Sequence, residues 1–507
     1  MLFQAIANKA MKKHIAARSF SLQLILHLLT ASAHCQGLDN RWMGGFEGFA
    51  PIPYGGSTIN FITGAPDIYY DNRPIDVRTT TSNISDPAGD LLFFTNGVVV
   101  GQANGDTMQN GTGLNPSTYT DWYPEGLYLY QANLIMPDPA SADEYYLFHN
   151  TIDVLPDFVP QFLYASKVDM TLAGGNGAVT QKNQVIFNGN VQPGHLTAVR
   201  HGNGRDWWVY AHEFNSNSFL RWLLSPTGLA GPVMQGVGVY RAPDPGQVVI
   251  SKQGDQFAYF AGETGLDLFS LDRCDGVLSH LGHVDLDSAD FGLGVSFSPN
   301  GRFLYLSAQT RLYQVDGQAS DLQASVTQIA IWDSTYSPGP PFATLFGASK
   351  LAPDGKVYIS TMNSTDKLHV INYPDSLGAA CDIQQHAVTL PTYWFNSLPN
   401  HPNYHLGALD GSVCDSLDVG LTEQPENLNL SLYPNPNAGA FAITYAPQPT
   451  SGLLEVHALD GRVVHRESVA PWSQLKRVEL PRLAPGMYQC TVRFGEQEGM
   501  KRFVVEP

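Results

Sequence analysis

The chain has 507 residues, a formal net charge of −18 and only 15% charged residues. Residues 36–427 hold 16 of the 28 Lys and Arg and 39 of the 46 Asp and Glu, which leaves this central part near −23. Because phosphate contacts need clustered Lys and Arg, this acidity argues against nucleic acid and anionic membranes as partners. We expect a solvated acidic surface.

The first 35 residues have the pattern of a secretory signal peptide. Four Lys and Arg between positions 9 and 18 precede the apolar run Phe20–Leu29, and the small residues 31–33 follow. The run is too short to span a membrane. We expect cleavage after Ala33 or Cys35, and a true start at Met11, which opens a more ordinary signal peptide than Met1.

An internal repeat dominates the centre of the chain. Its clearest copies are Val295–Leu306 and Ser349–Ile359, each a strand, a Pro-Asn/Asp-Gly turn and a second strand. Proline presets the start of the turn and glycine accepts positive φ at its end, so the triplet predicts a hairpin. Looser copies lie around Gly89, Gly204 and Gly254, and a further copy, Ala132–Phe148, has a longer turn.

The turn glycines predict a β-propeller over residues 36–414. They recur about every 50 residues, with about four strands in each period, as in propeller blades. Six blades are countable from the sequence. Either the strand Thr58–Ile62 or the segment Tyr404–Leu406 could complete a seventh blade or close the ring.

A small β-domain is expected at the C-terminal end. Strand-like runs with alternating polarity fill residues 430–507, and Asp460-Gly461 between two of them favours a hairpin. About seven short strands suffice for an immunoglobulin-like sandwich. Residues 415–429 are polar and carry Gly420 and Pro425, which is typical of a linker between domains. The predicted fold is therefore all-β, a propeller of six or seven blades followed by a sandwich.

Four blocks in this domain resemble the type A sorting domain of type IX secretion substrates. They are Leu432–Phe441, Val456–Val464, Leu483–Tyr488 and Lys501–Val505, in that order. The motif positions are Tyr433, Pro434, Asn435, Pro436, Gly439, Asp460, Gly461, Gly486, Tyr488 and Lys501. The resemblance implies passage through the periplasm to the cell surface or medium, with the secretion machinery and a sorting peptidase as partners. It also implies removal of the domain and either attachment to lipopolysaccharide or release.

A weaker resemblance covers parts of the centre. The segments Asp86–Gly97, Leu271–Gly276 and Leu398–Gly411 are similar to elements of WD40-like propellers found upstream of such sorting domains. Members of that group are mostly uncharacterised, so the resemblance implies a fold and no activity.

Few cysteines follow the signal peptide. Cys381 and Cys414 flank the end of the central domain on an oxidising export route, so we expect them to form a disulfide. Cys274 and Cys490 belong to different predicted domains, and we expect both to be free and buried.

No contiguous catalytic or metal-binding motif is present. Histidines 195, 201 and 212, and the pair 401 and 405, could supply metal ligands, but histidines on turns are more often hydrogen-bonded surface residues. Residues Asp285, Asp287 and Asp290 lack the glycine and the terminal glutamate of a calcium loop. We therefore expect no metal and no cofactor, with calcium as the alternative.

Aromatic residues in loop-like sequence are candidates for ligand stacking. Trp122 and Trp394 lie beside Pro124 and Pro391, where a ring could stack on a sugar, although inter-blade packing is the alternative. These features favour a non-catalytic scaffold that binds an extracellular glycan or protein. Two alternatives stay open: a hydrolase or lyase with its active site at the channel mouth, and a structural component of the surface layer.

Overall fold

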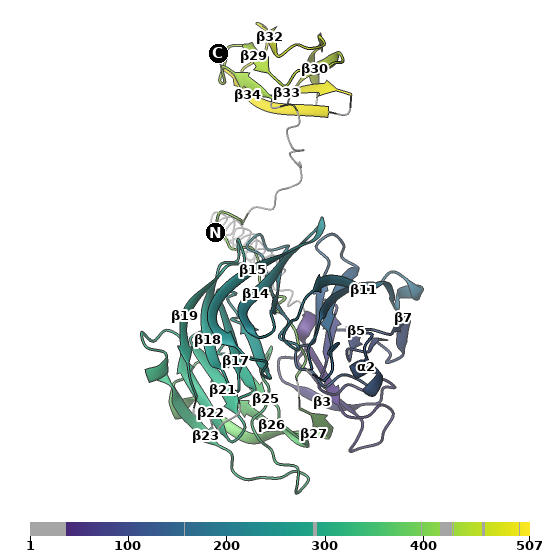
Figure 1. The fold of residues 1–507 in the computed structure, drawn as a ribbon, viewed down its shortest axis with the longest axis vertical. Coiled ribbons are helices and arrows are strands. Elements are labelled where there is room, and N and C mark those ends of the chain that lie inside the picture. Colours follow the sequence, from purple (N-terminus) through teal and green to yellow (C-terminus); the bar gives the residue numbers. More distant parts are fainter. Residues whose placement is uncertain are drawn as a thin grey trace, which may run out of the picture. The chain divides into compact units, whose positions relative to one another are not determined.

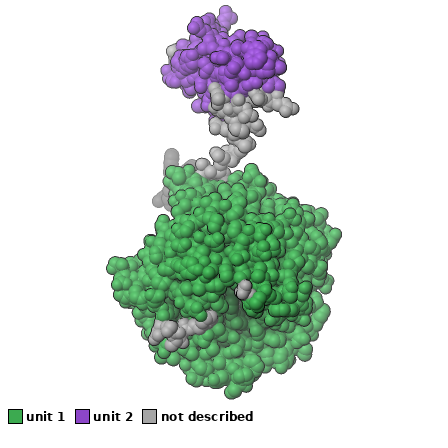
Figure 2. Space-filling model, in the orientation of Figure 1, with its two compact units in different colours: residues 1–417 green, residues 418–507 purple. Residues whose placement is uncertain are grey.

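The computed structural model describes residues 37–156, 158–286, 292–396, 398–415, 428, 430–458, 462–495 and 497–506. The predicted signal peptide, residues 416–427 of the predicted linker and the motif residues Asp460 and Gly461 lie outside this set. The chain divides into two compact units, residues 1–417 and 418–507 (Figure 2). Among the described residues, no helix has both the length and the apolar character needed to cross a membrane.

In its described part, the first unit contains seven groups of strands that form the blades of a propeller (Figure 1). Blade 1 has β1 (Arg41–Gly45), β2 (Gly56–Asn60) and β3 (Asp67–Asp71); blade 2 has β4 (Ser82–Ser85), β5 (Leu91–Thr95), β6 (Val99–Gln102) and β7 (Thr107–Thr112); blade 3 has β8 (Asn133–Pro137), β9 (Glu144–Asn150), β10 (Phe162–Asp169) and β11 (Ala178–Asn188). Blade 4 has β12 (Thr197–Arg200), β13 (Trp207–His212), β14 (Ser216–Ser225) and β15 (Gly228–Arg241); blade 5 has β16 (Gly246–Ile250), β17 (Gln256–Ala261), β18 (Gly265–Leu271) and β19 (Leu278–Val284). Blade 6 has β20 (Gly294–Phe297), β21 (Phe303–Ala308), β22 (Arg311–Asp316) and β23 (Thr327–Ile331); blade 7 has β24 (Ser349–Leu351), β25 (Val357–Ile359), β26 (Ser364–Ile371) and β27 (Ile383–Phe395).

The predicted turns join the first two strands of blades 2, 4, 5, 6 and 7. In each turn the glycine donates its N–H to the carbonyl three residues earlier, as Gly301 does to Ser298 at 2.9 Å. Its φ is 76°, in the left-handed region that favours glycine. The sequence repeat is therefore the physical hairpin that starts a blade.

Blades 2 and 3 share one sheet, which the sequence does not indicate. The outer strands β7 and β11 are joined in parallel through Gln109 and Ala178, so that β4 to β11 form an eight-stranded sheet. Lys182 strengthens the junction, because its ammonium donates to the carbonyls of Asn110 and Thr112 at 3.1 and 2.8 Å.

The ring closes between blade 1 and blade 7. Trp42 of β1 and Trp394 of β27 are both buried in one hydrophobic core, and the Ser57 and Thr392 hydroxyls lie 2.6 Å apart. Gly44 is needed at this seam, because a Cβ there would collide with the Trp394 ring. The expected strand at Thr58–Ile62 thus overlaps β2 of blade 1, and this blade raises the count from six to seven.

After β27 the chain crosses the propeller channel as the segment 398–414, here named the axial strap. The buried amide of Asn400 donates to the carbonyls of Asn133 and Leu196, each at 2.9 Å. The hydroxyl of Tyr404, which is fully buried, donates to the carbonyl of Ile135 at 2.8 Å. Leu409 donates its N–H to Gly202 at 2.7 Å. The strap therefore bonds to the inner strands or turns of several blades.

The end of the strap is held by a disulfide, and the partner predicted for Cys414 is wrong. Cys414 pairs with Cys274, on the turn between β18 and β19, with the Cα atoms 5.5 Å apart. Cys381 is free and fully buried beside Phe303 and Tyr305, so the expected Cys381–Cys414 bond is absent. The reason is topological, because the strap carries Cys414 across the channel and away from Cys381 in blade 7.

The second unit is a sandwich of two antiparallel sheets. One contains β28 (Ser431–Tyr433), β29 (Ala440–Thr444) and β32 (Leu475–Glu479), and the other contains β31 (Val463–Val469), β30 (Gly452–Ala458), β33 (Gly486–Phe494) and β34 (Gln497–Val505). Alternate residues fill the space between the sheets, among them Ile443, Leu454, Val492 and the free Cys490.

The Pro-Asn-Pro-Asn loop of the sorting motif is bonded to the last strand. Asn435 accepts from the N–H of Val504 at 2.8 Å, and Asn437 donates its N–H to the Val504 carbonyl at 3.0 Å. Gly439 has a φ of 88°, and a Cβ there would lie 2.5 Å from the Leu480 carbonyl oxygen. Tyr488 donates its hydroxyl to the Ala484 carbonyl at 2.9 Å. Asn435 and Asn437 thus hold the loop after β28 against the last strand of the domain.

Candidate functional site

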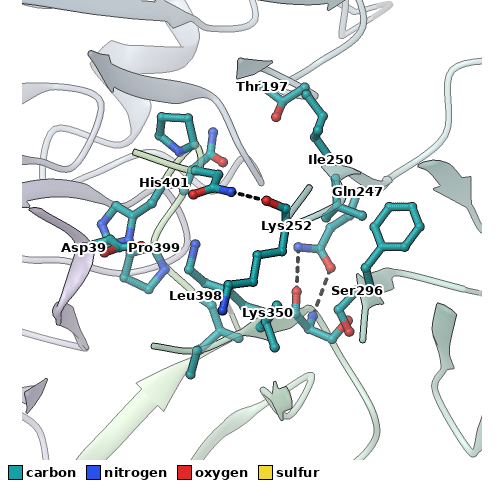
Figure 3. A pocket seen from close by; sticks show the side chains of 18 of the residues that line it. Asp39, Thr197, Gln247, Ile250, Lys252, Ser296, Lys350, Leu398, Pro399 and His401 are labelled. Carbon is teal, nitrogen blue, oxygen red and sulfur yellow. Dashed lines mark hydrogen bonds between the residues drawn. The ribbon is translucent and has the colours of Figure 1, made fainter. Parts of the chain in front are cut away.

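A cavity of about 340 Å³ lies in the propeller channel (Figure 3). Its walls come from β16, β20 and β24, the inner strands of blades 5, 6 and 7, and from the axial strap, with Asp39 and Asn40 on a further side. Because the strap bonds mainly to blades 2 to 5, the cavity occupies the part of the channel that faces blades 5 to 7. Its volume falls in the range of small-molecule sites.

Two glutamines keep the inner strands in place around the cavity. Gln247 of β16 accepts from the N–H groups of Val295 and Ser349, at 3.1 and 2.9 Å, and so bridges three blades. Gln131 accepts from the N–H of Val248 and donates to its carbonyl, each at 2.8 Å. Their polar atoms are therefore used for structure, and the ligand-facing groups must be other residues.

The cavity carries positive charge. Lys350 of β24 lies in its wall, and burial lowers the pKa of that ammonium to about 8 although Asp39 opposes the shift. The ammonium lies 5.7 Å from the centre of the Trp42 ring and makes no hydrogen bond or ion pair with any described residue. Lys252 is exposed among the lining residues.

The one carboxylate among the described lining residues is already neutralised. Asp39 bonds to Nε2 of His405 on the strap at 2.9 Å. Burial alone would raise the pKa of Asp39, but the hydrogen bond and charge of His405 lower it, and the same hydrogen bond raises the pKa of His405. Burial lowers the pKa of the nearby His401 to about 3, so that this ring is neutral.

Several buried polar groups of the wall have no partner among the described residues. They are the hydroxyls of Ser296 and Ser349 and Nδ1 of His401. Asn40, which is 6% exposed, lines the same cavity. Because buried polar groups are usually hydrogen-bonded, these groups are available to bond a polar ligand or water.

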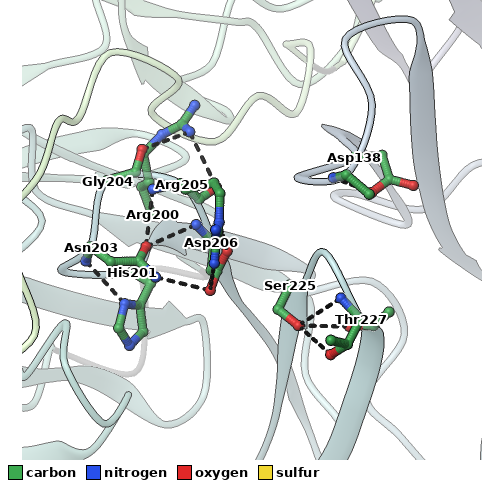
Figure 4. A network of polar contacts seen from close by, with 11 residues as sticks. Asp138, Arg200, His201, Asn203, Gly204, Arg205, Asp206, Ser225 and Thr227 are labelled. Atoms are coloured by element: carbon green, nitrogen blue, oxygen red, sulfur yellow. Dashed lines mark hydrogen bonds and ion pairs between the residues drawn. The ribbon is translucent and has the colours of Figure 1, made fainter. Parts of the chain in front are cut away.

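The turn between β12 and β13 contains a network of polar contacts around Asn203 and Asp206 (Figure 4). Asn203 accepts from the N–H groups of Arg205 and Asp206, each at 3.0 Å, which closes the turn. Arg200 donates to the Tyr404 carbonyl at 3.3 Å, and His201 bonds to the Cys274 carbonyl at 2.8 Å. The turn therefore joins the strap to the blade that bears Cys274.

The two candidate tryptophans have different environments. Trp122 ends the short helix α2 (Thr118–Trp122) and is 55% exposed. Trp394 is 1% exposed inside the core of blades 1 and 7, so it is wrong as a stacking residue. Side chains alternate along β27, and Tyr393 and Phe395 therefore lie on the opposite face from Trp394.

The two sequence segments that contain these tryptophans nevertheless meet. The ring of Tyr123 lies 4.9 Å from that of Tyr128, which lies 5.3 Å from Phe395. Phe46 follows at 5.7 Å from Phe395. The rings contact edge to face and are mostly half-buried, so they form a packed aromatic row with Trp122 beside its end.

The histidine candidates do not assemble. His195 and His212 are buried, and burial lowers their pKa values to about 4 and about 3. Within the described residues, no group of three or more His, Cys, Asp or Glu could hold a metal ion. Of the aspartates considered for calcium, Asp287 and Asp290 lie outside the described part, and Asp285 contacts His283 at 3.1 Å.

Sequence reasoning missed Lys350 and Asn40, because an isolated lysine in a strand and an asparagine before one look ordinary. The sequence did contain one indication of the site. His401 and His405 bracket Pro-Asn-Tyr in a segment that lacks the alternation of a strand, and this segment is the strap.

The comparisons with known proteins identify the C-terminal part of the chain. Residues 431–506 match the secretion system C-terminal sorting domain. No curated protein matches the sequence. Two solved structures bear the name "putative 6-phosphogluconolactonase". The one from Bacteroides uniformis is 12% identical, has a TM-score of 0.45, and its match covers 71% of this chain and 99% of the other chain. The one from Bacteroides fragilis is 12% identical, has a TM-score of 0.43, and its match covers 71% of this chain and 98% of the other chain. A protein from Lactobacillus plantarum is 12% identical with a TM-score of 0.36, covering 87% and 100%.

The sorting domain determines the destination of the protein. It engages the type IX secretion machinery, and residues 431–506 are thus the sorting domain of an exported protein that reaches the outer cell surface or the extracellular space.

Proposed function

We propose that the propeller is a non-catalytic scaffold that binds a small polar ligand, a saccharide unit, in its channel cavity outside the cell. One observation carries the proposal: the cavity wall contains buried polar groups without a partner among the described residues, namely the hydroxyls of Ser296 and Ser349 and Nδ1 of His401. Apolar side chains such as Phe297 and Leu351 alternate with them in the lining. Sugars present both hydroxyls and C–H faces, which match such a mixed wall.

The alternative of a hydrolase or lyase receives less support from the geometry. Glycoside hydrolysis generally needs two carboxyl groups that flank the bond to be cleaved. Asp39 is the one carboxylate among the described residues of the wall, and His405 already pairs with it. A general acid and base pair would therefore need a residue from outside the lining.

The pocket is tested by filling it. Ser296 is 2% exposed and lines the cavity, so Ser296→Leu should block it. We expect the purified protein to bind defined sugars saturably on a glycan array, and the variant to bind at least about tenfold more weakly, equivalent to about 1.4 kcal/mol. The matched control, Ser279→Leu, changes an exposed serine of β19 and should bind normally.

Two results would contradict this placement of the site. Normal binding by a folded Ser296→Leu protein would exclude the cavity, and loss of binding in Trp122→Ala would transfer the site to the aromatic row. Concentration-dependent self-association in sedimentation, without sugar binding, would favour a structural role in the surface layer.

We also propose that maturation removes the sorting domain by a cut within or just after residues 415–429. The propeller would end at 414 and the domain begin at 430, in keeping with separate hydrophobic cores in the two units. The sorting peptidase would then leave the propeller attached to lipopolysaccharide or free. Intact-mass analysis of surface or medium material should show a loss of residues 432–507, and their retention would contradict the proposal.

A further inference from the structure

We infer that the ligand of the channel cavity is a small hydroxylated anion, such as a sugar acid, whose acid group is held at Lys350. This inference rests on the proposed binding function and specifies the ligand class of the same site.

The charge of the cavity is opposite to that of the protein. The chain has a net charge of −18, yet the described ionisable residues of the lining are two lysines, two histidines and one aspartate. Asp39 and His405 neutralise each other at 2.9 Å. Lys252 and Lys350 are left without an ion-pair partner among the described residues, so the wall carries a net positive charge within an acidic protein.

Lys350 is the deeper of the two cations. It belongs to β24, opposite Tyr358 in the register of blade 7, and its ammonium lies 5.7 Å from the centre of the Trp42 ring. A buried charge is costly unless it is paired. Lys350 is half-buried, and its removal from water lowers the pKa of the ammonium to about 8. An anionic ligand would supply the missing partner.

Neutral groups around Lys350 suit the remainder of such a ligand. The hydroxyls of Ser296 and Ser349 line the same cavity and have no partner among the described residues. Thr197 of β12 adds a buried hydroxyl on a further side, and Figure 3 shows Thr197, Ser296 and Lys350 coming from three different strands around the cavity. The site can therefore bond hydroxyls at several points while one end holds the acid.

The inference is tested with three ligands that share one sugar ring. Glucose, glucuronate and glucose 6-phosphate are titrated into the purified full chain by calorimetry, so that only the group at C6 changes. We expect one of the two anions to bind at least about tenfold more tightly than glucose, because charge-assisted hydrogen bonds are about twice as strong as neutral ones. The two anions distinguish a carboxylate from a phosphate.

The variant Lys350→Met keeps the length of the side chain and removes the charge. It should abolish the preference for the anion, so that glucose and the two anions bind to the variant with affinities within about threefold of one another. Lys356→Met is the matched control, because Lys356 lies on the turn of the same blade, bonds to Asn372 at 2.9 Å and does not line the cavity. Anion binding should also weaken above about pH 8, as the Lys350 ammonium loses its proton.

The outcomes separate the two levels of the proposal. Equal binding of glucose and both anions to the wild type, or an anion preference that survives in Lys350→Met, overturns the inference and leaves the binding function standing. No binding of any of the three at 10 mM overturns the inference, and if the wider glycan array is also negative the proposed function falls with it.

Discussion

Replacing Cys274 with serine is expected to lower the free energy of unfolding of the propeller by about 4–5 kcal/mol. The disulfide closes a loop of 140 residues, and the chain-entropy model gives about 5 kcal/mol for a loop of that length. The loop includes blades 6 and 7 and the axial strap. Denaturation followed by tryptophan fluorescence reports this unit, because seven of the eight tryptophans lie in residues 37–415.

Cys381→Ala provides the control for that measurement. Cys381 is a free buried thiol of blade 7, and its replacement should cost about 1 kcal/mol, typical of a small change in a core. The two variants would be ranked in reverse if Cys381 were the true partner of Cys414. Equal and small losses in both would show that the 274–414 bond does not contribute to stability.

A second large effect is expected at Asp267 of β18. This carboxylate is 1% exposed and receives bonds from Arg241 at 3.1 Å, from His283 at 2.8 Å and from His280 at 3.0 Å. Asp267→Ala leaves the Arg241 charge, itself 1% exposed, without its partner. Breaking such a buried pair costs about 3–5 kcal/mol, and denaturant titration at pH 6 should show it.

The same network makes stability depend on pH. Burial alone would raise the pKa of Asp267, but the His283 hydrogen bond and the Arg241 charge hold it well below its usual range. Its contribution is therefore complete above the unfolded value of about 3.9 and is lost as the pH falls through the lower folded value. The hydrogen bond to Asp267 raises the pKa of His283, so its contribution is complete below about pH 6.5 and is lost as the pH rises through the folded value.

A matched control and a spectroscopic check accompany this prediction. Asp316→Asn removes the partner of Arg302, which is 46% exposed, and should cost less than about 1 kcal/mol. In Asp267→Asn, NMR titration of the His283 ring should show a lower pKa than in the wild type. An unchanged His283 pKa would mean that Asp267 does not perturb that histidine.

The hairpins of the propeller are predictable from the sequence because their cause is local. Each needs a turn that glycine can complete, as Gly301 and Gly355 do with φ near 80°, and the flanking apolar residues only have to alternate. The sandwich is predictable for the same reason. Local patterns therefore carry the all-β fold, most of the blades and the sorting domain.

The candidate site depends on contacts distant in sequence, and it could not be predicted. The strap has no strand pattern, yet it brings His405 to Asp39 and Cys414 to Cys274 across the channel. Trp394 has loop-like neighbours, but its face of β27 is decided by the packing of blade 7 on blade 1. In the sequence, Lys350 looks like a surface lysine. It lines the cavity only because β24 is the inner strand of blade 7.

The position of Cys414 also determines how the protein would bear mechanical load. It directly precedes the predicted linker, so tension on the C-terminal side enters the propeller at this residue. From there the disulfide offers a covalent path for the force to Cys274 of blade 5, parallel to the backbone of residues 398–413. In a tethered propeller the disulfide would therefore shield the hydrogen bonds of the strap, and with them the wall of the cavity, from part of the load.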